Sequence, residues 1–212
     1  IATLVNYAIH PDVIGSDKGI ISPDLCGPLY DRIESKAGGV ALFLNGAQGG
    51  MVTADNRSAE GDMEVWEECV RIGELLADEA LRIIADAPVQ ENPTLLCAAR
   101  NLTLPVASPL MRMLLMKSPM KDQMGNGDAV VTQLNVVNIG TAQLLTIPGE
   151  ALPNIGYYLK RNMPTKHAFL LGLANDAFGY ILTKYDFDSF ERYEYISQTS
   201  MGEMTGELYI EQ

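Results

Sequence analysis

The sequence predicts a mixed α/β fold, α+β-like, in which β-sheets with substantial antiparallel pairing are flanked by helices. In the first half of the chain, apolar strand-like runs alternate with segments of helical periodicity. In the second half, strand-like runs dominate, and a tight turn joins two of them as a hairpin. Hydrophobic residues make up 47% of the 212 residues, which is ample for a core. Because no repeat or linker interrupts these patterns, we expect a single domain over residues 1–212.

The first half contains the clearer elements. We expect a buried strand at 2–10, a helix that opens at Ser22-Pro23-Asp24 with a serine N-cap, and an apolar strand at 40–44. The most regular helix is expected at about 60–86, where apolar residues recur three and four positions apart. These apolar residues are Val65, Cys69, Ile72, Leu76, Ala80 and Ile83.

The second half is predicted to contain strands at 94–104, 130–138, 141–147 and 168–174, with a short helix near 151–161. The segment 108–124 holds five of the ten methionines. Methionine suits adaptable apolar surfaces, so this segment is either a lid over a lipid-like substrate or a connection packed on the body.

Charge and cysteine content exclude several classes of function. The formal net charge of −12 argues against binding to nucleic acid and to anionic membrane surfaces. The three cysteines are odd in number, far apart and without a CxxC motif, which argues against a disulfide framework or a zinc-thiolate site. No apolar run reaches transmembrane length, and no signal peptide is visible. Since the chain begins with Ile1 inside a strand, we expect that an N-terminal portion is missing; compartment and oligomeric state stay open.

Three predicted strands each lead to a polar side chain that suits a metal site. His10 ends the first strand before Pro11, Glu150 follows the strand at 141–147, and Tyr180 follows the strand at 168–174. Imidazole nitrogen and carboxylate oxygen are ordinary zinc ligands, and tyrosinate is a rarer one. Each has a plainer interpretation: His10 is a satisfied surface or core residue, Glu150 begins the next helix, and Tyr180 is a half-buried strand aromatic. His167 is expected at the surface.

The glycine-rich turn at 45–50 follows the apolar strand at 40–44. Gly49 and Gly50 are candidates for an anion nest of backbone N–H groups, that is, an oxyanion hole. The turn does not match the nucleotide-binding patterns GxxxxGK[ST] or GxGxxG.

Taken in order, these segments resemble the neutral/alkaline (non-lysosomal) ceramidase family over nearly the whole chain. The segments that carry the resemblance are Asn6–Pro11, Ile21–Asp24, Ala41–Ala47, Pro148–Glu150, Gly172–Asn175, Gly179–Ile181 and Tyr193–Glu194.

The resemblance implies a zinc-dependent amidase that splits the N-acyl bond of ceramide or a related N-acyl lipid. It implies that His10, Glu150 and Tyr180 are zinc ligands and that Tyr193 helps to hold the reacting carbonyl. Water activated by the metal would attack the amide carbonyl that the same zinc polarises. The chain would then be a catalytic domain that lacks its N-terminal portion.

Two departures from the family pattern define an alternative. A further zinc-binding histidine and a substrate-binding arginine lie upstream of the first strand in the family, and His167 lies in the wrong motif to replace that histidine. The Gly-Asp-Val-Ser-Pro pattern is altered here, and the nearby hydroxyl is that of Thr53 rather than a serine. The alternative is therefore a non-catalytic or differently specific relative that binds a metal or a ligand.

Overall fold

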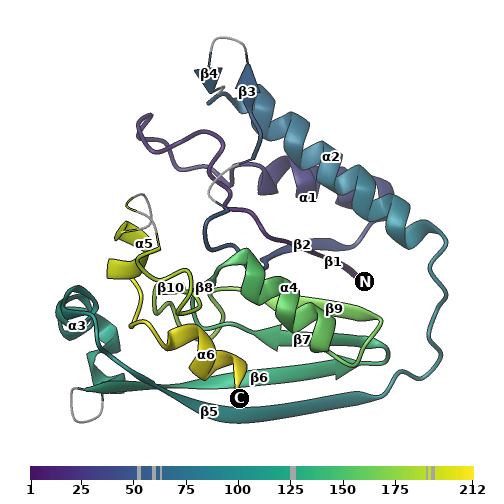
Figure 1. Cartoon of the computed structure of the whole chain (residues 1–212). Coiled ribbons are helices and arrows are strands. Elements are labelled where there is room, and N and C mark those ends of the chain that lie inside the picture. Colours follow the sequence, from purple (N-terminus) through teal and green to yellow (C-terminus); the bar gives the residue numbers. More distant parts are fainter. Residues whose placement is uncertain (52–53, 59–60, 63, 125–127, 190, 192–193) are drawn as a thin grey trace. The chain divides into compact units, whose positions relative to one another are not determined.

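The computed structural model contains two compact units (Figure 1). The first unit consists of Ile1–Asn45 and Met51–Glu91, and the second of Gly46–Gly50 and Asn92–Gln212. Helices and sheets are mixed, with both parallel and antiparallel pairing, which confirms the predicted α/β class. The expectation of a single domain stays a prediction. The structure describes residues 1–51, 54–58, 61–62, 64–124, 128–189, 191 and 194–212.

The first unit is built from a parallel pair of strands and two helices. Val5 and Ala41, on adjacent strands, are buried against helix residues that include Leu29, Ile33 and Ala77. In chain order, its elements are β1 (Ala2–Tyr7), α1 (Cys26–Ala37), β2 (Val40–Asn45), β3 (Arg57–Ser58), β4 (Gly61–Asp62) and α2 (Trp66–Ala85).

Three boundaries in this unit differ from the prediction. α2 begins at Trp66 rather than at about residue 60, because Gly61–Asp62 form the short strand β4. β1 ends at Tyr7 rather than at residue 10, and it is less buried than expected, since Val5 is buried while Leu4 and Tyr7 are exposed. α1 begins at Cys26 rather than at Ser22. The Ser22 hydroxyl accepts the Asp24 N–H, and Asp24 has a φ of +52°, which prevents an α-helix from continuing through it.

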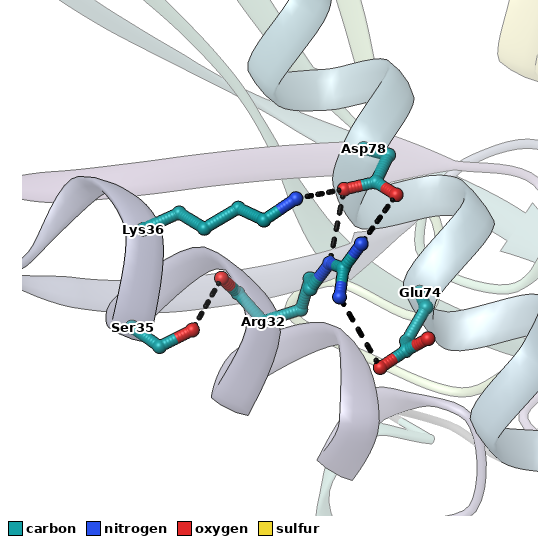
Figure 2. A network of polar contacts seen from close by, with 5 residues as sticks. All are labelled: Arg32, Ser35, Lys36, Glu74 and Asp78. Atoms are coloured by element: carbon teal, nitrogen blue, oxygen red, sulfur yellow. Dashed lines mark hydrogen bonds and ion pairs between the residues drawn. The ribbon is translucent and has the colours of Figure 1, made fainter.

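A network of charged side chains joins α1 to α2 (Figure 2). Arg32 makes two hydrogen bonds to Asp78, from Nε to Oδ1 at 3.0 Å and from Nη2 to Oδ2 at 2.9 Å. Lys36 Nζ donates to Asp78 Oδ1 at 2.7 Å, and Arg32 Nη1 lies 3.6 Å from Glu74 Oε1. The network therefore links the exposed sides of the two helices.

The Asp78 carboxylate is expected to make the stability of this unit pH-dependent. The Arg32 guanidinium and then the Lys36 ammonium hold the pKa of Asp78 well below its usual range near 4. A carboxyl group whose pKa is lowered by folding stabilises the folded state at pH values above its unfolded-state pKa. This stabilisation is lost as the pH falls through the folded-state pKa. The melting temperature should therefore fall less steeply between about pH 5 and pH 2 for Asp78→Asn than for the wild type. Because the side chains are 32–47% exposed, the difference should also shrink at high salt; identical pH profiles would contradict this role.

The second unit contains a four-stranded sheet in the order β5-β6-β7-β9. β5, β6 and β7 pair antiparallel, and β9 runs parallel to β7. The predicted hairpin is confirmed as β6 and β7. In chain order, the elements are β5 (Leu95–Pro105), α3 (Pro109–Met116), η1 (Pro119–Gln123), β6 (Ala129–Ile139), β7 (Ala142–Thr146), β8 (Glu150–Ala151), α4 (Pro153–Asn162), β9 (His167–Leu171), β10 (Tyr180–Ile181), α5 (Glu194–Gln198) and α6 (Thr205–Ile210).

The methionine-rich segment packs against the core of this second unit. Met111 and Leu115 of α3 and Met124 are buried in the same cluster as Leu102 of β5, whereas Met113 is half exposed. One face of α3 is therefore part of the core, which favours the packed connection over the lid. None of the helices formed by described residues combines the length and the apolarity needed to cross a membrane.

Candidate functional site

His10 lies in the first unit, three residues after the end of β1. Its side chain is half-buried, and Ile9 before it is buried in the core. The His10 N–H donates to the Met51 carbonyl at 3.3 Å, and the His10 carbonyl accepts the Asp12 N–H at 2.9 Å. The backbone around this imidazole is thus held on both sides.

Glu150 and Tyr180 lie in the second unit and are opposite each other in register. β8 and β10 pair parallel, with Glu150 opposite Tyr180, and the Glu150 N–H donates to the Gly179 carbonyl at 2.9 Å. Neighbouring strands lie about 4.8 Å apart, and paired residues point to the same face. A carboxylate and a phenol from positions 30 residues apart in sequence are therefore brought side by side.

Further backbone segments extend this pair of short strands on both sides. The Gly49 N–H donates to the Ala151 carbonyl at 2.9 Å, and the Tyr180 N–H donates to the Thr199 carbonyl at 3.1 Å. Tyr180 also forms a parallel bridge with Ser200. Glu150 and Tyr180 are thus the inner members of a ladder of four segments, which holds both backbones rigidly.

Glycines make this close approach possible. A Cβ on Gly149 would lie 2.5 Å from the Gly179 carbonyl oxygen, and a Cβ on Gly179 would overlap the Thr199 carbonyl oxygen. Gly179 also has a φ of +75°, which disfavours other residues. The glycines that precede Glu150 and Tyr180 in sequence are therefore what allows the two ligand candidates to be neighbours.

The expected oxyanion donors, Gly49 and Gly50, belong to the same ladder. The Gly49 amide is engaged with Ala151, and a Cβ there would overlap the Glu150 carbonyl oxygen. Gly50 is exposed, with a φ of +77°. An oxyanion would have to replace the Gly49–Ala151 bond, and the oxyanion role of both glycines stays a prediction.

The ring of Tyr180 meets a second tyrosine that the sequence analysis did not assign. Its centroid lies 5.9 Å from that of Tyr195 of α5, with an interplanar angle of 74°, an edge-to-face contact. Burial, then the Glu150 carboxylate, then Tyr195 raise the pKa of Tyr180. The family resemblance points to Tyr193 in this aromatic segment, and Tyr195 lies two residues further along the chain.

The polar residues between β9 and β10 have a structural role. The Asn175 amide donates to Asn135 Oδ1 at 2.7 Å, and Asp176 Oδ1 accepts Gln123 Nε2 at 2.9 Å. Asp176 Oδ2 also accepts the Thr132 hydroxyl. These contacts anchor the turn that leads to Tyr180 on β6 and η1.

The remaining predicted site residues divide as follows. Thr53 and Tyr193 lie outside the described residues. Glu150 lies in β8 and does not begin a helix, because α4 starts at Pro153; Tyr180 is indeed half-buried in a strand. His167 is exposed at the start of β9, as expected.

The donor set can be tested against zinc on the described residues. A carboxylate and a phenol at paired positions are both oxygen donors, and the proximity of Glu150 disfavours a Tyr180 phenolate unless a cation compensates it. Nearby, the side-chain amide of Gln48 is fully buried and finds no hydrogen-bond partner among the described residues. Among these residues, no group of three or more His, Cys, Asp or Glu is arranged to hold a metal. Glu150 and Tyr180 fit two positions of a zinc site, and the third, His10, lies in the other unit and stays a prediction.

Comparison with solved structures shows what fold the chain shares. A crystal structure of neutral ceramidase from Pseudomonas aeruginosa matches with a TM-score of 0.73 and 17% identity, over 98% of this chain and 42% of that one. A ceramidase complexed with C2 matches with a TM-score of 0.74 and 16% identity, over 99% and 44%. No family model matches the sequence, and no curated protein does. The chain thus spans less than half the length of these two structures and shares the fold of the corresponding part of a neutral ceramidase.

Proposed function

We propose that the chain forms part of a zinc-dependent amide hydrolase that cleaves the N-acyl bond of ceramide or a related N-acyl lipid. The observation that carries this proposal is the paired position of Glu150 and Tyr180 on β8 and β10. The likeness to neutral ceramidase supports it, because the similarity covers 98% of the chain and so includes the segments that hold His10, Glu150 and Tyr180.

His10, Glu150 and Tyr180 would hold the zinc. When bound, the ion supplies Lewis-acid polarisation of the amide carbonyl and lowers the pKa of a water ligand toward neutrality.

The other residues of the chain orient these ligands. The Glu150 N–H bond to Gly179 fixes the direction in which the carboxylate leaves its strand. The edge-to-face contact between the rings of Tyr195 and Tyr180 would help to hold the Tyr180 side chain, and with it the hydroxyl, in one position. The proposed roles of Tyr193, holding the carbonyl, and of Thr53, in place of the family serine, rest on the sequence resemblance.

Metal content and amide hydrolysis of the full-length protein test this proposal. We expect one zinc per chain by elemental analysis and release of fatty acid from an N-acylsphingosine. Removing the zinc with a chelator should reduce the rate to background, and adding zinc back should restore it. Absence of stoichiometric zinc would show that the site assignment is wrong. Zinc without turnover of any N-acyl lipid would instead support the binding-protein alternative.

A further inference from the structure

We propose that Asp24 is a positioning residue for His10, because its buried carboxylate anchors the loop that leads away from this histidine. The inference rests on the proposed function, in which His10 is a zinc ligand. It concerns the first unit alone.

The Asp24 carboxylate is an internal hydrogen-bond acceptor for three donors. The residue is 5% exposed. Oδ2 accepts the Ile14 N–H at 2.9 Å and the Cys69 thiol at 3.5 Å, and Oδ1 accepts the Leu25 N–H at 2.7 Å. An ionised carboxylate only accepts hydrogen bonds, so it is suited to a pocket lined by donors. One side chain thereby joins the loop after His10 to the start of α1 and to α2.

The backbone of Asp24 is held in a conformation that non-glycine residues rarely adopt. Its φ of +52° lies in the left-handed region, which costs about 1–2 kcal/mol for most residues and less for Asp or Asn. The conformation directs the side chain toward Ile14 immediately before α1 begins. Strain that is retained in a buried loop marks a position whose geometry matters.

The anchor lies close enough to His10 to restrict the backbone that carries its imidazole. Only three residues separate His10 from Ile14, and the Asp12 N–H bond to the His10 carbonyl tightens this segment further. Val13 and Ile14 are buried in one cluster with Leu25 and Cys69. His10 is therefore fixed by β1 on one side and by the Asp24 anchor on the other. A metal ligand requires this precision, since coordination tolerates displacements of only about 0.2 Å.

Asp24→Asn in the full-length protein tests the inference. Asparagine keeps the size and tolerates the positive φ, but it replaces one acceptor oxygen with an NH₂ group. The backbone N–H of either Ile14 or Leu25 then faces the asparagine NH₂ group, which is itself a donor. We expect zinc affinity, measured by chelator competition, to fall about 10–100-fold, the range found when groups that orient metal ligands are lost. For amide hydrolysis, kcat should decrease while KM stays unchanged.

A second readout does not depend on activity. The imidazole NMR signals of His10 are identified in the full-length protein as those that disappear in a His10→Gln variant. In the zinc-free protein, Asp24→Asn should shift the His10 signals. The matched control is Cys26→Ala, which removes a buried side chain of the same cluster but leaves the Asp24 bonds intact. It should lower stability and leave zinc affinity within about twofold.

The possible outcomes separate this inference from the proposed function. A wild type without zinc overturns the proposed function. A wild type that binds zinc, with Asp24→Asn binding as tightly and the His10 signals unshifted, overturns only the role of Asp24. If Asp24→Asn does not fold, hydrogen exchange of the wild type decides instead. Coupling is reciprocal, so zinc should slow exchange of the Ile14 and Leu25 amides, and unchanged exchange rejects the inference.

Discussion

Glu150→Gln is expected to remove zinc from the protein and to lower amide hydrolysis by more than about 10²-fold, beyond the loss seen for residues that merely orient metal ligands. Glutamine keeps the volume of the side chain and the Glu150 N–H bond to Gly179, so the ladder stays intact. What is lost is the negative charge and one acceptor oxygen at the position opposite Tyr180. Zinc per chain by elemental analysis and fatty-acid release from an N-acylsphingosine measure the two effects.

The matched control for this substitution is Glu203→Gln. Glu203 is an exposed carboxylate of the same unit, and it lies in neither β8 nor β10. The control changes the net charge equally and should leave zinc content and rate unchanged. If Glu150→Gln kept its full complement of zinc, Glu150 would not be a ligand, and the ligand assignment would have to be withdrawn.

Gly179→Ala should produce the second large effect, a loss of about 2–5 kcal/mol in the free energy of unfolding. The positive φ accounts for about 1–2 kcal/mol. Overlap between the new Cβ and the Thr199 carbonyl oxygen accounts for about 1–3 kcal/mol more, because backbone cannot move aside as a flexible side chain does. Relief requires breaking the Tyr180–Thr199 bond, so zinc affinity should fall as well. Urea unfolding and chelator competition measure the two quantities.

Gly19→Ala provides the comparison that isolates the steric part. Gly19 has a φ of +61°, and a Cβ there would meet nothing within 4 Å. Only the backbone cost of about 1–2 kcal/mol is expected at this position, with no change in zinc affinity. Equal losses for the two variants would mean that the close approach of the Gly179 and Thr199 segments does not contribute.

Local sequence signals predicted the longer elements well. The hairpin of β6 and β7 and the regular part of α2 follow from alternation and from spacings of three and four, which reflect local backbone geometry. Boundaries were less accurate where a side chain competes with the helix. Ser22 and Asp24 resembled the start of a helix, but their side chains bond within the loop and delay α1 to Cys26.

The contacts that hold these residues in place could not be read from local patterns. β8 and β10 have two residues each, too few for any periodicity, and they pair because glycines 30 positions apart allow two backbones to meet. Local patterns also do not predict the contact between the rings of Tyr195 and Tyr180. Nor do they predict the bond from the Ile14 N–H to the Asp24 carboxylate, which reaches across a loop.

The sequence by itself determined the α/β class, the residue types suited to a zinc site and the resemblance to ceramidases, because composition, periodicity and motif order are properties of the chain. Only the tertiary structure decided that Glu150 and Tyr180 are neighbours, that Gly49 bonds to Ala151, and that Asp24 anchors the loop after His10. These are contacts between segments distant in sequence. They depend on how closely two backbones approach, and that distance is set by packing rather than by local conformational preference.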